Sequence, residues 1–391
     1  MGASCAKTKN EKGFTILTYQ NKFMKKYFTL LIGLILFISA KTLAQGCIAI
    51  RSTGGASMLT HPEKNDEKSW DFSASARYFK SFRHFSGTEE NKSRQTEGST
   101  VINHQASLDL AITRTINNRW SFLLDVPVLS NSRSSLYEHG LVNGVYIKKE
   151  RHSTHSFGIG DIRFAAYAWL FDPKKSRGNV QLGLGIKLPT GDYNYKDYWY
   201  NVGPGGTKEL RTVDQSIQLG DGGTGFTVEV NAFYPFTPDL TIYSNGFYLL
   251  NPREQNGTRT YRETLSPALA NEAIMSVPDQ YMFRAGFSYS IAAIKGLSVA
   301  GGVKLEGIPV NDLIGGSGDF RRPGYIWSVE PTVTYSLKNI NLFVSVPFAF
   351  YRNRTQSVTD KENSIKQGKH VQGDAAFANY VINAGFSVPI K

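Results

Sequence analysis

The sequence predicts an all-β protein, a transmembrane antiparallel β-barrel of about twelve strands, and two observations support this. Apolar residues recur on every second position in segment after segment, from Trp70 to near the end of the chain. The connections between these segments alternate between short turns and long polar loops. Alternation with a period of two indicates strands, because successive side chains point to opposite faces. Short turns at one end and long loops at the other are typical of outer-membrane barrels.

The composition agrees with such a barrel. Charged residues make up 19% of the 391 residues, aromatic residues 13%, and the mean hydropathy is −0.28. This is too polar for a helical membrane protein, but it suits strands whose apolar residues alternate with polar ones. The formal net charge is +12, and the first 46 residues hold seven lysines against one glutamate. Because the remainder has no dense basic stripe with interleaved aromatic residues, we expect no nucleic-acid partner.

The N-terminal segment resembles an export signal. Residues 1–23 look like an extended start, and Met24 begins a basic segment followed by the apolar run 28–40. We expect cleavage after Ala44, where small residues precede the site. The predicted organisation is therefore a leader at 1–44, a periplasmic segment at 45–69 and the barrel at 70–391. Cys5 lies in this leader, so the mature chain would keep only Cys47 and could form no internal disulfide.

The stretch 156–193 shows the strand pattern most clearly. Apolar residues alternate from Ile162 to Leu170 and again from Val180 to Leu188. Turn residues, among them Asp172-Pro173, separate the two halves. The stretch therefore predicts a hairpin with one apolar face and one mixed, partly charged face.

The same reasoning divides the barrel region into strands of similar pattern. The predicted strands are about 70–85, 105–113, 120–128, 156–170, 180–189, 226–234, 240–250, 281–290, 297–306, 325–337, 342–350 and 380–388. An even number places both ends of the barrel on the periplasmic side, as a cleaved export signal requires. A secreted β-sandwich would explain the alternation. It would not explain the alternating loop lengths or the aromatic residues near strand ends, which suit membrane interfaces.

Charged residues on the polar faces are the first group of candidate functional residues. Such groups are tolerated in a polar lumen and not against lipid. They could support the barrel wall as a network of ion pairs, or form a constriction that selects solutes. The candidates are Asp71, Arg77, Asp109, Asp125, Asp161, Arg163, Lys187, Glu229, Arg284, Lys304, Glu306 and Glu330.

Prolines near the expected outer ends of strands are the second group. Proline lacks the N–H that a closed strand ladder needs, so it marks a bulge, a rim or a local break. Either the membrane-spanning part ends there, or the wall is weakened and lets an apolar solute leave sideways. The candidates are Pro127, Pro189, Pro252, Pro309 and Pro347.

Signs of catalysis and of metal binding are weak. His104 is the one histidine near a predicted strand, and no partner motif accompanies it. His139, His152 and His155 share one outer loop, where solvated side chains are expected. We therefore expect no enzyme, no metal and no cofactor, although a barrel hydrolase stays open as a second alternative.

Two motifs in the central hairpin resemble a known family. They are Phe157-Gly158-Ile159-Gly160-Asp161-Ile162 and the stretch from Gly183 to Asp192, which ends Leu-Pro-Thr-Gly-Asp. Together they are similar to the outer-membrane channels of the MetA pathway of phenol degradation. The resemblance implies an outer-membrane barrel that passes small, apolar or aromatic solutes, with outer-membrane lipid and such a solute as its partners. We expect a monomer, with an oligomer left open. The main alternative is a closed barrel that acts in surface binding or as a structural protein.

Overall fold

The computed structural model describes residues 68–142, 145–146, 150–262 and 265–390. The described residues all belong to one compact unit. The predicted leader, its cleavage site and nearly all of the expected periplasmic segment lie outside the described residues.

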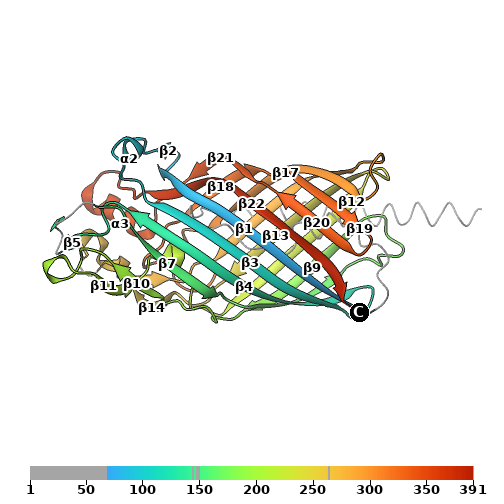
Figure 1. Ribbon diagram of the computed structural model, residues 1–391, viewed down its shortest axis with the longest axis horizontal. Coiled ribbons are helices and arrows are strands. Elements are labelled where there is room, and N and C mark those ends of the chain that lie inside the picture. The colour runs from blue at the N-terminus through green and yellow to red at the C-terminus, as the bar shows by residue number, and fades with distance from the viewer. Residues whose placement is uncertain (1–67, 143–144, 147–149, 263–264, 391) are drawn as a thin grey trace, which may run out of the picture. The chain divides into compact units, whose positions relative to one another are not determined.

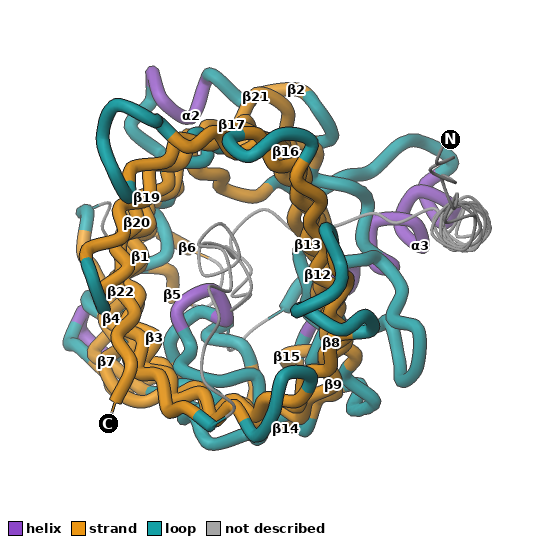
Figure 2. Tube along the Cα trace, turned by 90° about the vertical axis from the view of Figure 1, so that its right-hand side faces the viewer, coloured by secondary structure: helices purple, strands orange, loops and turns teal. Residues whose placement is uncertain are grey.

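Twelve wall strands form a closed antiparallel barrel, which confirms the predicted fold. Figure 2 looks along the barrel and shows the ring of strands. The first and last strands close it, with Trp70 opposite Ile390. In order around the wall the strands are β1 (Ser69–Ser86), β3 (Ile102–Thr115), β4 (Trp120–Ser135), β7 (His152–Ile159) continued by β8 (Arg163–Trp169), β9 (Asn179–Lys187), β12 (Gly225–Pro235), β13 (Leu240–Leu250), β16 (Gln280–Ser290), β17 (Leu297–Ile308), β18 (Gly324–Val329) continued by β19 (Thr332–Leu337), β20 (Ile340–Ser345) continued by β21 (Phe348–Asn353), and β22 (Ala375–Ile390).

The connections alternate in length as predicted. Short turns lie at the end of the barrel where β22 finishes (Figure 1), and this end is periplasmic in barrels of this type. The long segments at the opposite end carry the remaining elements: β2 (Glu89–Glu90), α2 (Ser93–Thr96), β5 (Leu141–Val142), β6 (Val145–Tyr146), β10 (Lys196–Trp199), η1 (Pro204–Gly206), β11 (Glu209–Thr212), η2 (Gln215–Ile217), β14 (Gln255–Arg259), η3 (Pro267–Glu272), β15 (Ile274–Ser276) and α3 (Val358–Gln367). Among the described residues, no helix has the length and apolar character needed to cross a bilayer.

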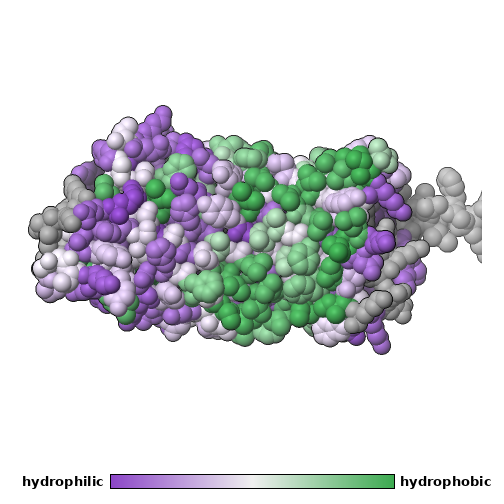
Figure 3. Space-filling model, viewed as in Figure 1, coloured by the Kyte–Doolittle hydropathy of each residue, from purple (hydrophilic) through white to green (hydrophobic). Residues whose placement is uncertain are grey.

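The apolar face of the strands points outward. Leu108, Phe122, Leu184, Phe226 and Phe287 are all exposed large side chains of this face. Figure 3 shows the apolar surface gathered over the half of the barrel nearer the short turns, with a hydrophilic surface toward the long segments. An outward apolar zone on a closed barrel matches lipid on the outside, and closure satisfies the backbone groups that lipid could not. The protein is therefore an outer-membrane barrel.

Three of the wall strands that the residue pattern predicted as continuous are interrupted, and one of the breaks lies at Pro347, which was expected to mark a bulge, a rim or a local break. The expected continuous strand 156–170 breaks at residues 160–162 between β7 and β8. The expected strands 325–337 and 342–350 break at Glu330-Pro331 and at Val346-Pro347. Proline explains the last two breaks, because it cannot donate to a strand ladder. At the first break β4 changes partner, from β8 up to Asp125 to β7 from Val128 onward, with Pro127 between them.

Candidate functional site in the barrel lumen

None of the twelve charged candidates is exposed. Seven are buried, namely Asp125, Asp161, Lys187, Glu229, Lys304, Glu306 and Glu330. The other five are half-buried, namely Asp71, Arg77, Asp109, Arg163 and Arg284. Their strand neighbours on the opposite face, such as Phe164 and Phe283, are exposed to the outside. The alternation therefore turns these charged groups away from lipid.

Eight of the candidates form four ion pairs inside the wall. The pairs are Arg163–Asp125 at 2.7 Å, Lys187–Asp161 at 3.6 Å, Arg284–Glu330 at 3.3 Å and Lys304–Glu306 at 2.9 Å. The other four make different contacts. Glu229 accepts a hydrogen bond from Tyr167 (3.1 Å) and interacts electrostatically with Arg163, and Arg77 donates to Asn383 (3.2 Å). Asp71 accepts from Ser69 (3.1 Å) near the periplasmic end, and Asp109 lies opposite Ser75 of β1. Buried charges are tolerated when they are paired in this way.

The segment 188–224 folds inward and narrows the lumen. The sequence analysis placed it among the outer loops, but its one-turn helix η2 lies against the inner face of the wall. Gln105 of β3 donates a hydrogen bond to the carbonyl of Ser216 (2.8 Å), and Ser156 of β7 donates to that of Ile217 (2.5 Å). Val213 and Ile217 are 0% exposed and Leu219 is 4% exposed. These apolar residues in an otherwise polar loop were the signal that could have revealed the inward course of the segment.

Asp214 anchors this inward segment. Its carboxylate binds Arg322 at 2.8 Å and lies 3.7 Å from Arg133 of β4. Burial alone would raise the pKa of Asp214, but the two guanidinium groups outweigh burial and hold this pKa well below its usual range. The carboxylate is therefore ionised at every physiological pH, and the anchor is permanent.

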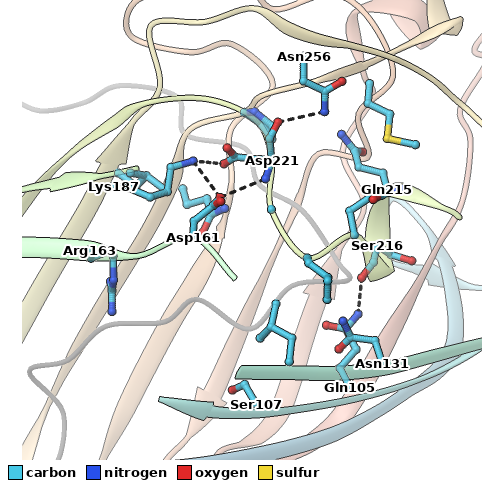
Figure 4. Close-up of a pocket in the computed structure, with 18 of the residues that line it drawn as sticks. Gln105, Ser107, Asn131, Asp161, Arg163, Lys187, Gln215, Ser216, Asp221 and Asn256 are labelled. Carbon is cyan, nitrogen blue, oxygen red and sulfur yellow. Dashed lines mark hydrogen bonds and ion pairs between the residues drawn. The ribbon is translucent and has the colours of Figure 1, made fainter. Parts of the chain in front are cut away.

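The two hairpin motifs meet at the interruption between β7 and β8. The Asp161 carboxylate accepts hydrogen bonds from the backbone N–H of Gly191 (3.0 Å) and of Asp221 (3.1 Å). The hydroxyl of Thr190 donates to the carbonyl of Gly160 (2.9 Å). Lys187 bridges Asp161 and Asp221 (Figure 4). The motifs thus replace the missing strand ladder with side-chain hydrogen bonds and join the inward segment to the wall.

Small residues are required at this junction. A Cβ added at Gly191 would lie 2.5 Å from the carbonyl oxygen of Leu219, and one at Gly220 would lie 2.5 Å from the Asp161 carboxylate. Leu219 itself closes the interruption from inside. A Cβ at Gly158 would lie 2.8 Å from its side chain, and one at Gly160 would meet its carbonyl oxygen at 3.1 Å.

A cavity of about 140 Å³ lies in the lumen beside this junction (Figure 4). Charged groups on its lining include Arg77, Asp161, Arg163 and Lys187. The apolar part of its lining includes the large side chains Phe79, Leu129, Leu219, Phe247, Leu249 and Met275. The cavity is therefore amphipathic, and two of its apolar residues, Leu129 and Leu219, also close the wall interruption.

The five prolines divide into two groups. Pro127 lies inside β4 rather than at its outer end, and Pro347 lies between β20 and β21. Both accompany interruptions of the wall. Pro189, Pro252 and Pro309 follow the last residues of β9, β13 and β17 by one or two positions, so they mark the ends of strands.

The histidines give no catalytic constellation in the part of the chain that the structure describes. His104 faces outward and contacts the hydroxyl of Tyr78 at 2.8 Å. His139 is 1% exposed and stacks on Trp199 with ring centroids 5.0 Å apart, so the expectation of a solvated side chain is wrong for it. No group of three or more His, Cys, Asp or Glu residues in the described ranges is placed to hold a metal ion.

Comparison with solved structures agrees with the fold. The COG4313 outer membrane channel from Pseudomonas putida F1 matches 85% of this chain and 98% of its own, with a TM-score of 0.53 and 10% identity. This chain has an outer-membrane channel fold. The resemblance predicted from the two motifs is thereby confirmed at the level of the fold.

Two further channel structures resemble the barrel more distantly. A monoaromatic hydrocarbon channel, the TodX deltaS2S3 mutant, matches 88% of this chain and 97% of its own (TM-score 0.40, 10% identity). The Ralstonia pickettii toluene transporter TbuX matches 89% and 96% (TM-score 0.39, 9% identity). At these scores neither bears on function. No protein-family model and no curated protein matches the sequence.

Proposed function

We propose that the barrel is a passive channel for small apolar or aromatic solutes, which enter the lumen from outside and leave sideways through the interruption between β7 and β8. One observation carries the proposal. Leu129 and Leu219 line the lumen cavity and also close the interruption. At the interruption a solute in the cavity is therefore separated from the outside of the wall by Leu129, Leu219 and a few local hydrogen bonds, and not by a continuous strand ladder.

The surroundings of the interruption support an apolar solute. Phe157 and Ile159, on the outer face of β7, are 68% and 52% exposed. In a bilayer these side chains contact lipid, because they lie on the face that carries the apolar surface of the barrel. An apolar solute would pass from one apolar environment to another, whereas a hydrophilic solute would have to give up its hydration.

Surface binding by a closed barrel is the alternative function. It would need the outer segments to offer accessible aromatic rings. Trp199 and Tyr261 stack on each other with centroids 4.7 Å apart, and Trp199 is 1% exposed. These two rings hold the outer segments together, but Tyr198 and Tyr200 beside them are 46% and 39% exposed, so surface binding stands as the alternative.

Uptake by cells tests the proposed function. The barrel is expressed in a host that lacks its general porins, and initial uptake of a small aromatic hydrocarbon is compared with that of a hydrophilic solute of similar size. The Gly160→Val variant fills the interruption, because an added Cβ already meets Leu129, Leu219 and Pro127 at 3.1 Å. We expect it to lower aromatic uptake to the level of cells without the barrel.

A matched glycine controls for folding. Gly301→Val adds the same side chain at a position where a Cβ meets nothing within 4 Å, and it should leave aromatic uptake unchanged. Wild-type uptake of the aromatic solute no faster than in cells without the barrel would contradict the proposed function. Equal uptake by the wild type and the Gly160→Val variant would contradict the sideways route.

A further inference from the structure

The basic residues of the barrel are distributed unevenly between its two ends. At the periplasmic end, eight basic side chains stand against three acidic ones among the described residues, Asp71, Asp172 and Asp239. The six long outer segments instead hold 15 basic and 18 acidic described residues. We name the eight the periplasmic basic rim: Lys68, Arg114, Arg119, Lys174, Lys175, Arg177, Lys295 and Lys338.

Most of the rim is exposed to solvent. Seven of its members, all except Arg114, are exposed. Lys175 forms an ion pair with Asp172 at 3.7 Å on the surface, and such exposed pairs are weak. Four of the five short turns contribute at least one rim residue, so the charge surrounds this end rather than forming one patch.

The guanidinium groups of two rim arginines lie over outward-facing aromatic rings. The guanidinium of Arg114 lies 4.9 Å from the ring centre of Trp70, and that of Arg177 lies 5.6 Å from the ring centre of Tyr234. Trp70 and its neighbour Trp120 are each nearly half exposed on the outer face of the wall. Aromatic residues in this position lie at the level of lipid headgroups, and long basic side chains there extend toward the water.

From this placement we propose that the periplasmic basic rim binds the phosphates of anionic glycerophospholipids in the leaflet that faces the periplasm. The rim is positively charged, opposite to the phosphates, and its aromatic neighbours place it at the level of the lipid headgroups. Each basic residue close to an anionic lipid surface contributes about 1 kcal/mol of binding free energy, which is roughly a fivefold change in affinity. The nearly balanced outer segments offer no comparable attraction.

Quenching of tryptophan fluorescence by brominated lipids tests this proposal, because Trp70 and Trp120 lie at the rim. The full-length barrel is reconstituted in phosphatidylcholine vesicles that contain equal amounts of acyl-brominated phosphatidylglycerol or acyl-brominated phosphatidylcholine. A Trp327→Phe background removes the signal of β18. We expect stronger quenching by the anionic lipid at low salt, and loss of the difference at high salt.

Two charge variants locate the site. Replacing Lys174, Lys175, Arg177, Lys295 and Lys338 by glutamine should make the two lipids quench equally. The control replaces the same number of exposed lysines at the outer end, Lys92, Lys208, Lys361, Lys366 and Lys369, and should keep the difference. Folding of each variant is checked by its heat-dependent gel mobility. Equal quenching of the wild type by the two lipids, or a preference that survives in the rim variant, would overturn the proposal.

Discussion

At the scale of single residues, the charge of a side chain in the wall is compensated by the groups that lie next to it. Asp125 is 1% exposed and accepts two hydrogen bonds from Arg163 through one carboxylate oxygen, at 2.7 and 3.1 Å. Removing one member of a buried pair leaves the other charge without compensation, which costs more than the pair itself contributes. Such pairs therefore fix the shape of the lumen more than they add stability.

We predict that Arg163→Met lowers the free energy of unfolding by about 3–5 kcal/mol, because Asp125 stays buried without its cation. The double variant with Asp125→Leu should recover most of the loss. Urea unfolding in lipid vesicles measures both, and the coupling follows from the double-mutant cycle. If the Arg163→Met variant were as stable as the wild type, Arg163 would not be needed to compensate the charge of Asp125.

Protonation of His139 provides a second prediction at this scale. Its Nδ1 accepts a hydrogen bond from the backbone N–H of Tyr200 (3.1 Å), and burial lowers its pKa to about 4. In the unfolded chain the pKa is near 6.5, so between these values the unfolded state binds more protons. The stability contributed by neutral His139 is therefore complete above about pH 6.5 and is lost as the pH falls toward 4.

Hydrogen exchange at the Tyr200 amide measures this effect. After correction for the intrinsic exchange rate, its protection should fall between pH 7 and pH 4.5. In the His139→Gln variant, the amide side chain can still accept the hydrogen bond but does not titrate, so protection should not vary over this range. Protection of the Tyr200 amide that stays constant with pH in the wild type would contradict this account of His139 protonation.

At the scale of elements, the interrupted strand and the inward segment form one unit. Asp161 and Thr190 supply hydrogen bonds where the β7/β8 ladder is missing, and Asp214 holds the far part of the segment. The alternation on either side of the break predicted strand structure. The apolar positions shift from odd numbers (Phe157, Ile159) to even numbers (Ile162, Phe164) across Gly160-Asp161, and this shift was the local sign of the break. Its hydrogen-bond partners could not be predicted, because they lie 30 to 60 positions further along the chain.

We predict that Asp214→Asn loosens the inward segment, because an amide cannot pair with both Arg133 and Arg322 as a carboxylate does. The expected results are faster cleavage within residues 188–224 by an added protease and a larger single-channel conductance. Asp192→Asn is the control, since Asp192 is exposed and its side chain bonds the backbone N–H of Asn194 two residues on. Unchanged cleavage and conductance in Asp214→Asn would show that the anchor does not hold the segment.

At the scale of the whole molecule, period and loop length were sufficient to predict the barrel and its strand number. These features follow from local alternation, which a closed lipid-facing wall imposes on every strand. The partners of the lumen charges could not be predicted, because Arg163–Asp125 and Arg284–Glu330 depend on register between strands. The inward course of 188–224 was missed for a similar reason, since Ile217 and Leu219 read locally as loop residues.

Sideways release at Gly160 is the central claim, and a reversible cross-link tests it most directly. Leu129→Cys and Leu219→Cys, with Cys47 replaced by serine, place one thiol on the wall and one on the inward segment that closes it, and they leave Gly160 unchanged. We predict that oxidation stops uptake of an aromatic hydrocarbon, that reduction restores it, and that single-channel conductance is the same in both states. Aromatic uptake that continues at the same rate in the oxidised protein, with the disulfide verified by thiol titration, would contradict sideways release.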